Sequence, residues 1–413
     1  MVEIRIGFVS TWFERGAAYV TKAYLKLLQE KHDVFVYARG GEATGEGDKN
    51  WDFDYVTWGL RLPSTQIDWK HFKKWVDTRR LDTIFFNEQT DMEVVLRLRK
   101  ERPSIKIGSY VDYYKENTIQ DFRYFDFLIC NTKRHYCVLN WHPQCFYVPW
   151  GTDIYLFQPK NLAEKINHKL VFFHSMGMSN RKGTKDLIET FIEHKLGSRA
   201  RLVIHTQIPL ETYFEINPNE LTQNNIDVIL KTVPAPGLYH LGDIYVYPTR
   251  LEGIGLSIYE ALSCGLPVIA TDIPPVNEII NNDIGKLIEV QSQVTRSDAY
   301  FWPQAIINKY ALAKRMEYFI EHTHKIPEYK KRAREFAQKN LNWNDRKETV
   351  QEIFETTAKL SIRENDIWQG LSQIKERRYK NLLKAIFDFL PSTLKASVYQ
   401  KLQRCKLTHK KKS

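Results

Sequence analysis

The chain of 413 residues has a hydrophobic fraction of 43% and a charged fraction of 26%. Such a composition is typical of soluble globular proteins, and the length allows two domains with full hydrophobic cores. No apolar run reaches the roughly 18 residues that a membrane-spanning helix requires, which argues against an integral membrane protein.

The cysteines and the first predicted strand indicate the cellular compartment. None of the five cysteines forms a C-x-x-C pair, and an odd number argues against a disulfide framework. A strand is predicted as early as residues 4–9, so we expect no signal peptide before it. A reducing cytoplasm is therefore the expected location.

The net charge of +11 is concentrated near the end of the sequence. Residues 375–413 contain twelve Lys or Arg and two acidic residues, which gives this segment +10 and leaves +1 for residues 1–374. A nearly neutral body is thus followed by a strongly basic tail. The tail also has apolar residues at helical spacing, namely Tyr379, Leu382, Leu383, Ile386, Phe387 and Leu390.

Three partners are compatible with this basic amphipathic tail. It is suited to lie on an anionic membrane surface, which would place the protein peripherally on the inner membrane face. Alternatively, its apolar face packs on the protein's own body. Nucleic acid is the least favoured partner, because the basic residues are not interleaved with exposed aromatic residues or part of a known nucleic-acid module.

The first residues predict a Rossmann-type α/β domain. Residues 2–10 alternate into a strand, residues 17–29 have helical spacing, and Gly16 lies in the loop between them. No G-x-G-x-x-G motif is present, so close backbone approach to a ligand is plausible only at Gly16, and a plain connection is the alternative. Further strands are predicted at 33–38, 83–87, 105–110, 125–131, 170–175, 202–206 and 227–230.

The stretch 243–278 carries the strongest functional pattern. It predicts a buried strand at 244–247, a glycine-rich loop, a helix at 256–263 and a second strand from residue 268. A glycine-rich turn before a helix N-terminus presents free N–H groups to an anion such as phosphate. Glu252 and Glu260 flank this turn, and carboxylates bind sugar hydroxyls rather than phosphate. Phosphate together with sugar points to a nucleotide sugar.

This stretch, P-T-x-x-E-G-I-G-L-S-x-x-E-A-L-S-C-G-x-P-V-I-A-T with Glu252-x7-Glu260, resembles the signature of family-4-type retaining glycosyltransferases. The resemblance implies a GT-B fold, two facing Rossmann-like domains with a central cleft. It implies an acceptor domain at 1–160, a nucleotide-sugar domain at 161–343 and a helix at 344–374 that crosses back to the first domain. The tail at 375–413 is not part of the resemblance.

The same resemblance implies roles for individual residues. Glu252 would position the donor sugar as a catalytic residue, and Glu260 would hold the nucleotide ribose. Lys182, followed by Gly183 as in the family, and Arg181 would bind the donor diphosphate. The remaining predicted donor-binding residues are the glycine of the first loop and the backbone that follows Glu252, namely Gly16, Gly253, Ile254, Gly255, Leu256 and Ser257.

The sequence departs from the family pattern at two positions. Met178 occupies the place of a family arginine, and Val111-Asp112 occupies the place of a His-Asp pair that faces the acceptor. Asp112 either lines the acceptor pocket as a second catalytic residue or caps the next element. These departures keep open an alternative, a catalytically weak GT-B subunit that binds or scaffolds within a glycosylation complex.

The activity implied by the resemblance is transfer of a sugar from a nucleoside-diphosphate sugar to an acceptor hydroxyl with retention of the anomeric configuration. We expect no metal and no cofactor beyond the donor, since the family fold is metal-independent. Asp52-Phe53-Asp54 imitates the D-x-D metal motif, and we interpret it as a coincidence. The tail alone suggests a lipid-linked acceptor glycan, and hence glycan or glycolipid biosynthesis at the cytoplasmic membrane face.

Overall fold

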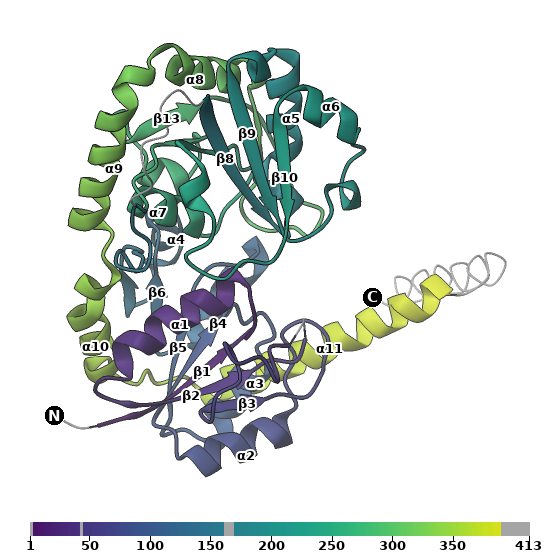
Figure 1. The fold of residues 1–413 in the computed structure, drawn as a ribbon. Helices are drawn as coiled ribbons and strands as arrows, with labels where there is room; N and C mark the ends of the chain where they lie inside the picture. The colour runs from purple at the N-terminus through teal and green to yellow at the C-terminus, as the bar shows by residue number, and fades with distance from the viewer. Residues whose placement is uncertain (1–2, 42–43, 161–168, 390–413) are drawn as a thin grey trace. The chain divides into compact units, whose positions relative to one another are not determined.

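The structure of the protein is a computed structural model that describes residues 3–41, 44–160 and 169–389. Contacts divide the chain into two compact units (Figure 1). The larger unit consists of Met1–Thr90 and Ile105–Lys359, and the smaller consists of Asp91–Ser104 and Leu360–Ser413. Each unit is described below by itself.

A seven-stranded parallel sheet forms the first domain of the larger unit. Its strands are rich in aromatic and β-branched residues, and β4 is buried along its whole length, as expected for a sheet covered on both faces. The strand order is β3 (Val56–Trp58), β2 (Asp33–Ala38), β1 (Arg5–Ser10), β4 (Thr83–Asn87), β5 (Lys106–Tyr110), β6 (Phe127–Cys130) and β7 (Cys145–Tyr147). Its helices include α1 (Gly16–Leu28), α2 (Trp69–Arg79) and α4 (Lys133–Leu139).

A six-stranded parallel sheet forms the second domain. The strand order is β10 (Ile226–Leu230), β9 (Ala200–Thr206), β8 (Leu170–Gly177), β11 (Ile244–Tyr247), β12 (Val268–Thr271) and β13 (Gly285–Ile288). Its helices are α5 (Thr184–Glu193), α6 (Pro218–Gln223), α7 (Leu256–Ser263), α8 (Lys309–Glu321) and α9 (Ile326–Asn340). Two parallel sheets with helices on their faces confirm the predicted α/β fold with two Rossmann-like domains.

A two-stranded antiparallel hairpin extends the second domain. It consists of β14 (Val290–Val294) and β15 (Gln304–Ile307), which pair with each other and with neither large sheet. The loop between these strands, residues 295–303, contacts the first domain through Tyr300 and Trp302. The sequence analysis did not predict this hairpin.

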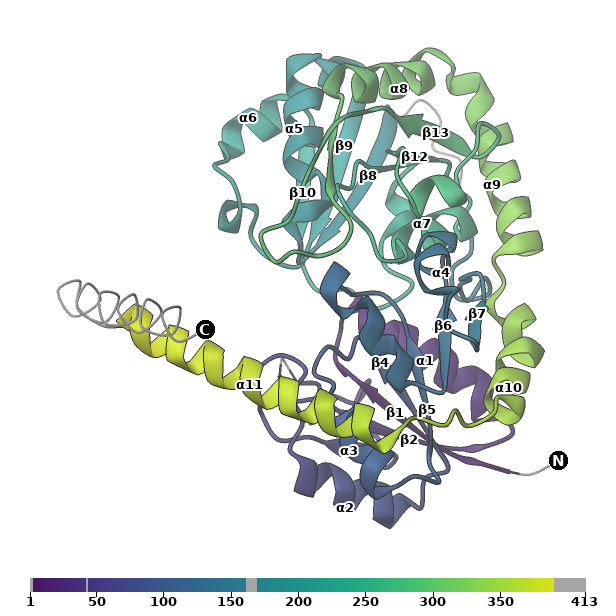
Figure 2. The ribbon, with the colours of Figure 1, turned by 180° about the vertical axis from the view of Figure 1, so that it is seen from behind.

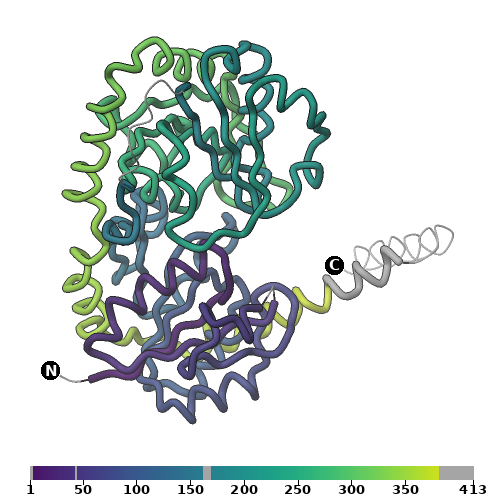
Figure 3. The backbone as a smooth tube through the Cα atoms, in the orientation of Figure 1, coloured from purple at the N-terminus to yellow at the C-terminus, as the bar shows by residue number. Residues whose placement is uncertain are grey.

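After α9 the chain returns to the first domain, as the tube in Figure 3 shows. The indole Nε1 of Trp343 donates to the carbonyl oxygen of Ala23 at 2.9 Å. Helix α10 (Lys347–Thr356) then packs on α1, where Gln351 Nε2 donates to the Leu27 carbonyl oxygen at 2.9 Å. The predicted helix at 344–374 is therefore not one helix, because α10 ends at Thr356 and the next helix begins at Glu364.

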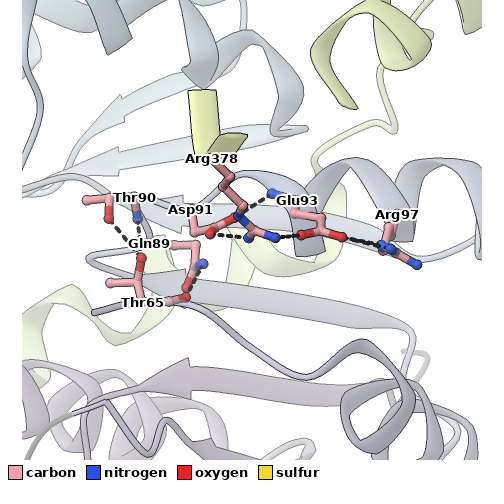
Figure 4. Close-up of polar contacts among 7 residues, drawn as sticks. All are labelled: Thr65, Gln89, Thr90, Asp91, Glu93, Arg97 and Arg378. Atoms are coloured by element: carbon pink, nitrogen blue, oxygen red, sulfur yellow. Dashed lines mark hydrogen bonds and ion pairs between the residues drawn. The ribbon is translucent and has the colours of Figure 1, made fainter. Parts of the chain in front are cut away.

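The smaller unit pairs α3 (Glu93–Glu101) with α11 (Glu364–Phe389), which lie side by side in Figure 2. The ammonium group of Lys100 lies 3.5 Å from the ring centroid of Trp368. Arg378 of α11 forms ion pairs with both Asp91 and Glu93, as Figure 4 shows. These contacts hold α11 along α3 through one cation–π contact and through two ion pairs made by a single guanidinium.

Helix α11 runs without interruption past residue 374, where the sequence analysis placed the start of the basic tail. The predicted boundary at 374/375 is therefore not a structural one. Within the predicted tail, the backbone is described as far as Phe389, and residues 390–413 lie outside the described residues. None of the helices that the structure describes is long and apolar enough to cross a membrane.

Candidate active site

A cavity of about 1230 Å³ is lined by both domains of the larger unit. The first domain contributes the loop before α1 and the ends of β4 and β5, and the second contributes the loops after β8 and β11. These positions follow the general rule for parallel sheets, in which ligands bind at the carboxyl ends of the strands. Every residue that the sequence analysis assigned to the site lines this one cavity.

Two glycines shape the second-domain side of the cavity. Gly255 has a φ of +85°, which an L side chain rarely adopts, and it turns the chain from the loop into α7. No side chain caps the first turn of α7, and the Ile258 N–H donates to the Gly255 carbonyl oxygen at 2.9 Å. The N–H groups of Leu256 and Ser257 are therefore the ones available to a ligand. Gly183 has a φ of +73°, and a Cβ there would lie 1.9 Å from the Pro248 carbonyl oxygen. Only glycine therefore lets the Lys182 loop approach the end of β11.

Glu252 and Lys182 meet in this cavity as a buried ion pair. The Lys182 Nζ lies 2.7 Å from Glu252 Oε1, which also accepts hydrogen bonds from Thr249 at 2.6 Å and Tyr247 at 2.8 Å. Burial by itself would raise the pKa of Glu252, but the charges of Lys182 and Arg181 outweigh it and lower that pKa. Glu252, which is 4% exposed, is therefore held as a carboxylate.

The three donors share a single oxygen of Glu252. Within the described residues, no hydrogen bond reaches the other oxygen, Oε2. One oxygen thus fixes the side chain, and the second is available to accept a proton from a ligand hydroxyl.

Glu260 lies in the second turn of α7 and also lines the cavity. Its Oε2 accepts a hydrogen bond from the Tyr239 hydroxyl at 2.5 Å. Burial raises the pKa of Glu260 to about 7, although Tyr239 and Lys182 act in the opposite direction. Near neutral pH this carboxyl is therefore divided between its protonated and ionised forms.

On the first-domain side, Asp112 lies among groups that the sequence analysis did not find. Its Oδ1 is 3.4 Å from Nε2 of His135, a buried residue of α4. Burial raises the pKa of Asp112, but His135 and a hydrogen bond with Glu88 lower it below the ordinary value. Burial and the neighbouring Asp112 conversely raise the pKa of Glu88. Of the two carboxyls, Glu88 therefore keeps its proton to a higher pH than Asp112 does.

Glu88 lies at the end of β4 with a φ of +52°, which is unusual for a residue with a side chain. Such strain is characteristic of functional positions, where the surrounding structure enforces it. The sequence analysis did not identify Glu88 as a site residue, because Glu88 belongs to no recognised motif. His135 likewise reaches Asp112 only through the packing of α4.

The two domains touch directly at the glycine loop. A Cβ on Gly253 would lie 2.0 Å from Asp112 Oδ1, so the absence of a side chain is required for this contact. Gly16 begins α1 and faces the same loop, and a Cβ there would lie 3.5 Å from Leu256. That distance is an ordinary contact, so packing does not require a glycine at position 16.

The hairpin loop at 295–303 completes the wall beside Asp112. The Tyr300 hydroxyl donates to the Asp112 carbonyl oxygen at 2.9 Å, and the Tyr113 hydroxyl donates to Asp298 at 3.1 Å. The rings of Tyr113 and Tyr300 stack with centroids 5.0 Å apart. Arg296 and Asp298 of the loop line the cavity, so the second domain also contributes to the acceptor side predicted for the first.

The D-x-D sequence at 52–54 lies in a local turn. The Asp52 carboxylate accepts hydrogen bonds from Gly47 N at 2.8 Å and from the Trp58 indole at 2.9 Å. Neither Asp52 nor Asp54 lines the cavity. Among the residues that the structure describes, no group of three or more His, Cys, Asp or Glu side chains could hold a metal ion.

Comparisons with known proteins find similarity in the second domain and in the fold. Residues 167–299 match the family described as glycosyl transferases group 1. Over 152 residues the chain is 30% identical to the GtfA subunit of a UDP-N-acetylglucosamine–peptide N-acetylglucosaminyltransferase from Limosilactobacillus reuteri, with 35% of this chain and 28% of that protein covered. Over 151 residues it is 32% identical to the capsular polysaccharide biosynthesis glycosyltransferase CapM from Staphylococcus aureus, with 34% and 39% covered. The matches span well under half the length of these relatives.

Solved structures resemble most of the chain at low sequence identity. Anabaena HepE in complex with UDP-glucose superposes with a TM-score of 0.67 at 15% identity, covering 86% of this chain and 100% of that one. The pneumococcal O-GlcNAc transferase GtfA in complex with UDP and GlcNAc has a TM-score of 0.65 at 13% identity, covering 86% and 100%. Sucrose-phosphate synthase from Thermosynechococcus elongatus has a TM-score of 0.66 at 16% identity, covering 85% and 98%. These likenesses establish the fold, which is the GT-B arrangement that the sequence predicts.

The raised pKa of Glu260 makes stability depend on pH in a defined direction. The folded state binds this proton more tightly than the unfolded state, so the stabilising contribution is present below about pH 4.5 and is lost as the pH rises through about 7. Glu260→Gln removes the ionised carboxylate and keeps an acceptor for Tyr239. We expect the variant to be more stable than the original protein by about 2 kcal/mol near pH 8, with the difference shrinking near pH 5.

Thermal unfolding followed by circular dichroism across this pH range measures the effect. The exposed Glu211→Gln is the matched control, and its difference from the original protein should not vary in this way. A Glu260→Gln difference that stays constant from pH 5 to pH 8 would contradict the assignment.

Proposed function

We propose that this protein is a glycosyltransferase that moves a sugar from a nucleoside-diphosphate sugar to an acceptor hydroxyl with retention of the anomeric configuration. The observation that carries the proposal is the convergence of three features on one cavity. These are the Glu252–Lys182 ion pair, the uncapped N-terminus of α7 and the Glu260 carboxyl that lines the cavity. Together they provide sites for a phosphate, for a donor sugar and for the hydroxyls of a ribose.

The donor half of the mechanism uses the second domain. Lys182, Arg181 and the N–H groups that follow Glu252 bind the diphosphate, and Glu260 accepts hydrogen bonds from the ribose. Glu252 Oε2 accepts a hydrogen bond from a hydroxyl of the donor sugar. Negative charge grows on the diphosphate as the glycosidic bond breaks, and prearranged cations and N–H groups stabilise that charge without a metal ion.

The acceptor half of the mechanism uses Asp112 and Glu88. The ionised Asp112 orients an acceptor hydroxyl toward the anomeric carbon. In the retaining step, the bond from the anomeric carbon to the diphosphate oxygen breaks and a bond to the acceptor oxygen forms on the same face. The departing diphosphate oxygen takes the proton of the acceptor hydroxyl, so no protein nucleophile is required. Closure of the cavity excludes water, which would otherwise compete as acceptor.

Two departures from the family pattern, a missing histidine and a missing arginine, kept open a catalytically weak subunit. At each position, another residue of the same type lies close to the cavity. His135 lies 3.4 Å from Asp112 although the adjacent family histidine is replaced by Val111. Arg181 lines the cavity next to Lys182 although the family arginine is replaced by Met178. These placements support an active enzyme over a binding subunit.

The comparisons guide the choice of donor and product class. CapM is described as acting in capsular polysaccharide biosynthesis, and another relative, LpsB of Rhizobium meliloti, in lipopolysaccharide core biosynthesis. HepE and the pneumococcal GtfA were solved with UDP or a UDP-sugar. We therefore propose a UDP-sugar as donor and a glycan as acceptor, in cell-surface polysaccharide or glycolipid biosynthesis.

Donor binding and turnover test this proposal separately. In a thermal-shift screen against UDP, GDP, ADP and their sugars, a ligand at one hundred times its Kd should stabilise the protein by about 2.7 kcal/mol. Glu252→Gln should lower kcat about 100-fold, because the donor sugar loses its ionised acceptor. UDP should bind this variant at least as tightly, since Lys182 is released from its partner. Failure of every nucleotide to bind, or full turnover by Glu252→Gln, would overturn the proposal.

We further propose that the basic end of the chain binds an anionic membrane surface and so brings the enzyme to a lipid-linked acceptor on the cytoplasmic face. Residues 390–413 contain seven Lys or Arg and no acidic residue. Each basic residue near an anionic leaflet contributes about 1 kcal/mol before screening. Arg378, in contrast, is already paired with Asp91 and Glu93 within the smaller unit.

Truncation after Phe389 separates these two groups of charges. It removes the seven distal cations and retains α11 with its Arg378 ion pairs. The full chain should sediment with vesicles of phosphatidylcholine and phosphatidylserine at low salt, and the truncated chain should not, with an unchanged melting temperature. Vesicles of phosphatidylcholine alone are the control. Equal sedimentation of both chains with the anionic vesicles would exclude the membrane role of this segment.

A further inference from the structure

Two buried residues of α4 lie directly behind the glycine loop of the second domain. Arg134 is 6% exposed and His135 is 1% exposed, and neither belongs to the sequence pattern of the site. Both come from the first domain, so they join the domains at the level of the cavity. Their contacts involve the backbone of the loop and not only its side chains.

Arg134 binds carbonyl groups of the second domain. Its Nη2 donates to the carbonyl oxygen of Glu252, and its Nη1 donates to that of Pro274 at 2.7 Å. The Glu278 carboxylate in turn accepts hydrogen bonds from the first N–H groups of α4, at 2.8 Å from Lys133 N and 2.9 Å from Arg134 N. Helix α4 is thus held in place by the domain whose loop it contacts.

His135 lies between Arg134 and a pair of aromatic residues. Nε1 of Trp302 donates to the Tyr114 hydroxyl at 2.7 Å, and that hydroxyl lies 2.9 Å from Nδ1 of His135. Nη2 of Arg134, which can only donate, lies 3.4 Å from Nε2 of the same ring. The ring thus helps to hold the Arg134 guanidinium that binds the Glu252 carbonyl.

These contacts fix the direction of the peptide group that joins Glu252 to Gly253. In a planar trans peptide the C=O and N–H bonds point in opposite directions. The carbonyl of Glu252 points toward α4, so the N–H group of Gly253 in the same peptide points away from it. Both residues line the cavity, and no residue of the described chain accepts a hydrogen bond from the Gly253 N–H group.

We propose that Arg134, supported by His135, is a positioning residue that aims the Gly253 N–H group at the terminal phosphate of a bound nucleoside diphosphate. The inference rests on the proposed function and adds a group behind the loop that the function itself does not require. The charge of Arg134 on the carbonyl side also polarises the peptide, which strengthens the N–H as a donor.

The arrangement further makes phosphate binding depend on contact between the domains. The loop belongs to the second domain and α4 to the first, so the Gly253 N–H group is aimed only while α4 is docked. Trp302 of the hairpin loop takes part from the other side, since its ring lies 5.1 Å from the Arg134 guanidinium. A domain movement that undocks α4 would therefore weaken the hold on the terminal phosphate alone.

The test compares nucleoside diphosphates with the monophosphates that lack the terminal phosphate. Calorimetric Kd values for UDP, GDP and ADP, each beside its monophosphate, are measured for the original protein and for Arg134→Gln. The variant should bind the diphosphate about tenfold more weakly, as expected for misdirected donors to a charged group, and the monophosphate equally well. Lys133→Gln removes a neighbouring exposed cation of the same helix and is the matched control.

Arg134→Lys guards against an effect of misfolding, because it keeps the buried charge and one donor and should recover part of the diphosphate affinity. Equal losses for diphosphate and monophosphate, or no loss for either, would overturn the positioning role. A loss in Lys133→Gln as large as in Arg134→Gln would assign the effect to net charge and would also overturn it. If the original protein bound no nucleoside diphosphate, the proposed function would fail first.

Discussion

The ion pair between Glu252 and Lys182 is the interaction on which the site depends. It joins the loops that follow β8 and β11, and it does so in a buried place where two charges are costly to remove from water. Hydrogen bonds from Thr249 and Tyr247 offset part of that cost. A buried ion pair is weak evidence for stability, so its presence is better explained by what it prepares, namely a carboxylate with one oxygen fixed and a cation ready for phosphate.

Around this pair the two domains contribute different kinds of group. The second domain supplies backbone N–H groups, cations and Glu260, which suit a nucleotide, and the first supplies the Glu88 and Asp112 carboxyls, which suit a hydroxyl. The contact between Gly253 and Asp112 places these sets side by side. Helix α4 and the hairpin loop at 295–303 hold the boundary between them, so the geometry of the reacting groups depends on how the domains dock.

Much of this arrangement follows from local sequence signals. The strands at 33–38 and 244–247 were predicted with the bounds that the structure has, because their apolar runs end at polar residues or proline. The helix at 256–263 was also predicted with its bounds, because its helical pattern ends before Gly265 and Pro267. Glu88, Arg134 and His135 could not be predicted, since they meet the site only through tertiary packing. The hairpin was missed because both strands are short and the first is rich in polar residues. The continuity of α11 was missed because the change in charge at residue 375 is not a change in structure.

A crystal structure of the protein with a bound UDP-sugar tests the central claim most directly. The account predicts the diphosphate within about 3 Å of Lys182 Nζ and of the Gly253 and Ile254 nitrogens, with the sugar on Glu252 Oε2 and the ribose on Glu260. A donor bound elsewhere, or bound in this cavity with its phosphates away from residues 252–260, would contradict it.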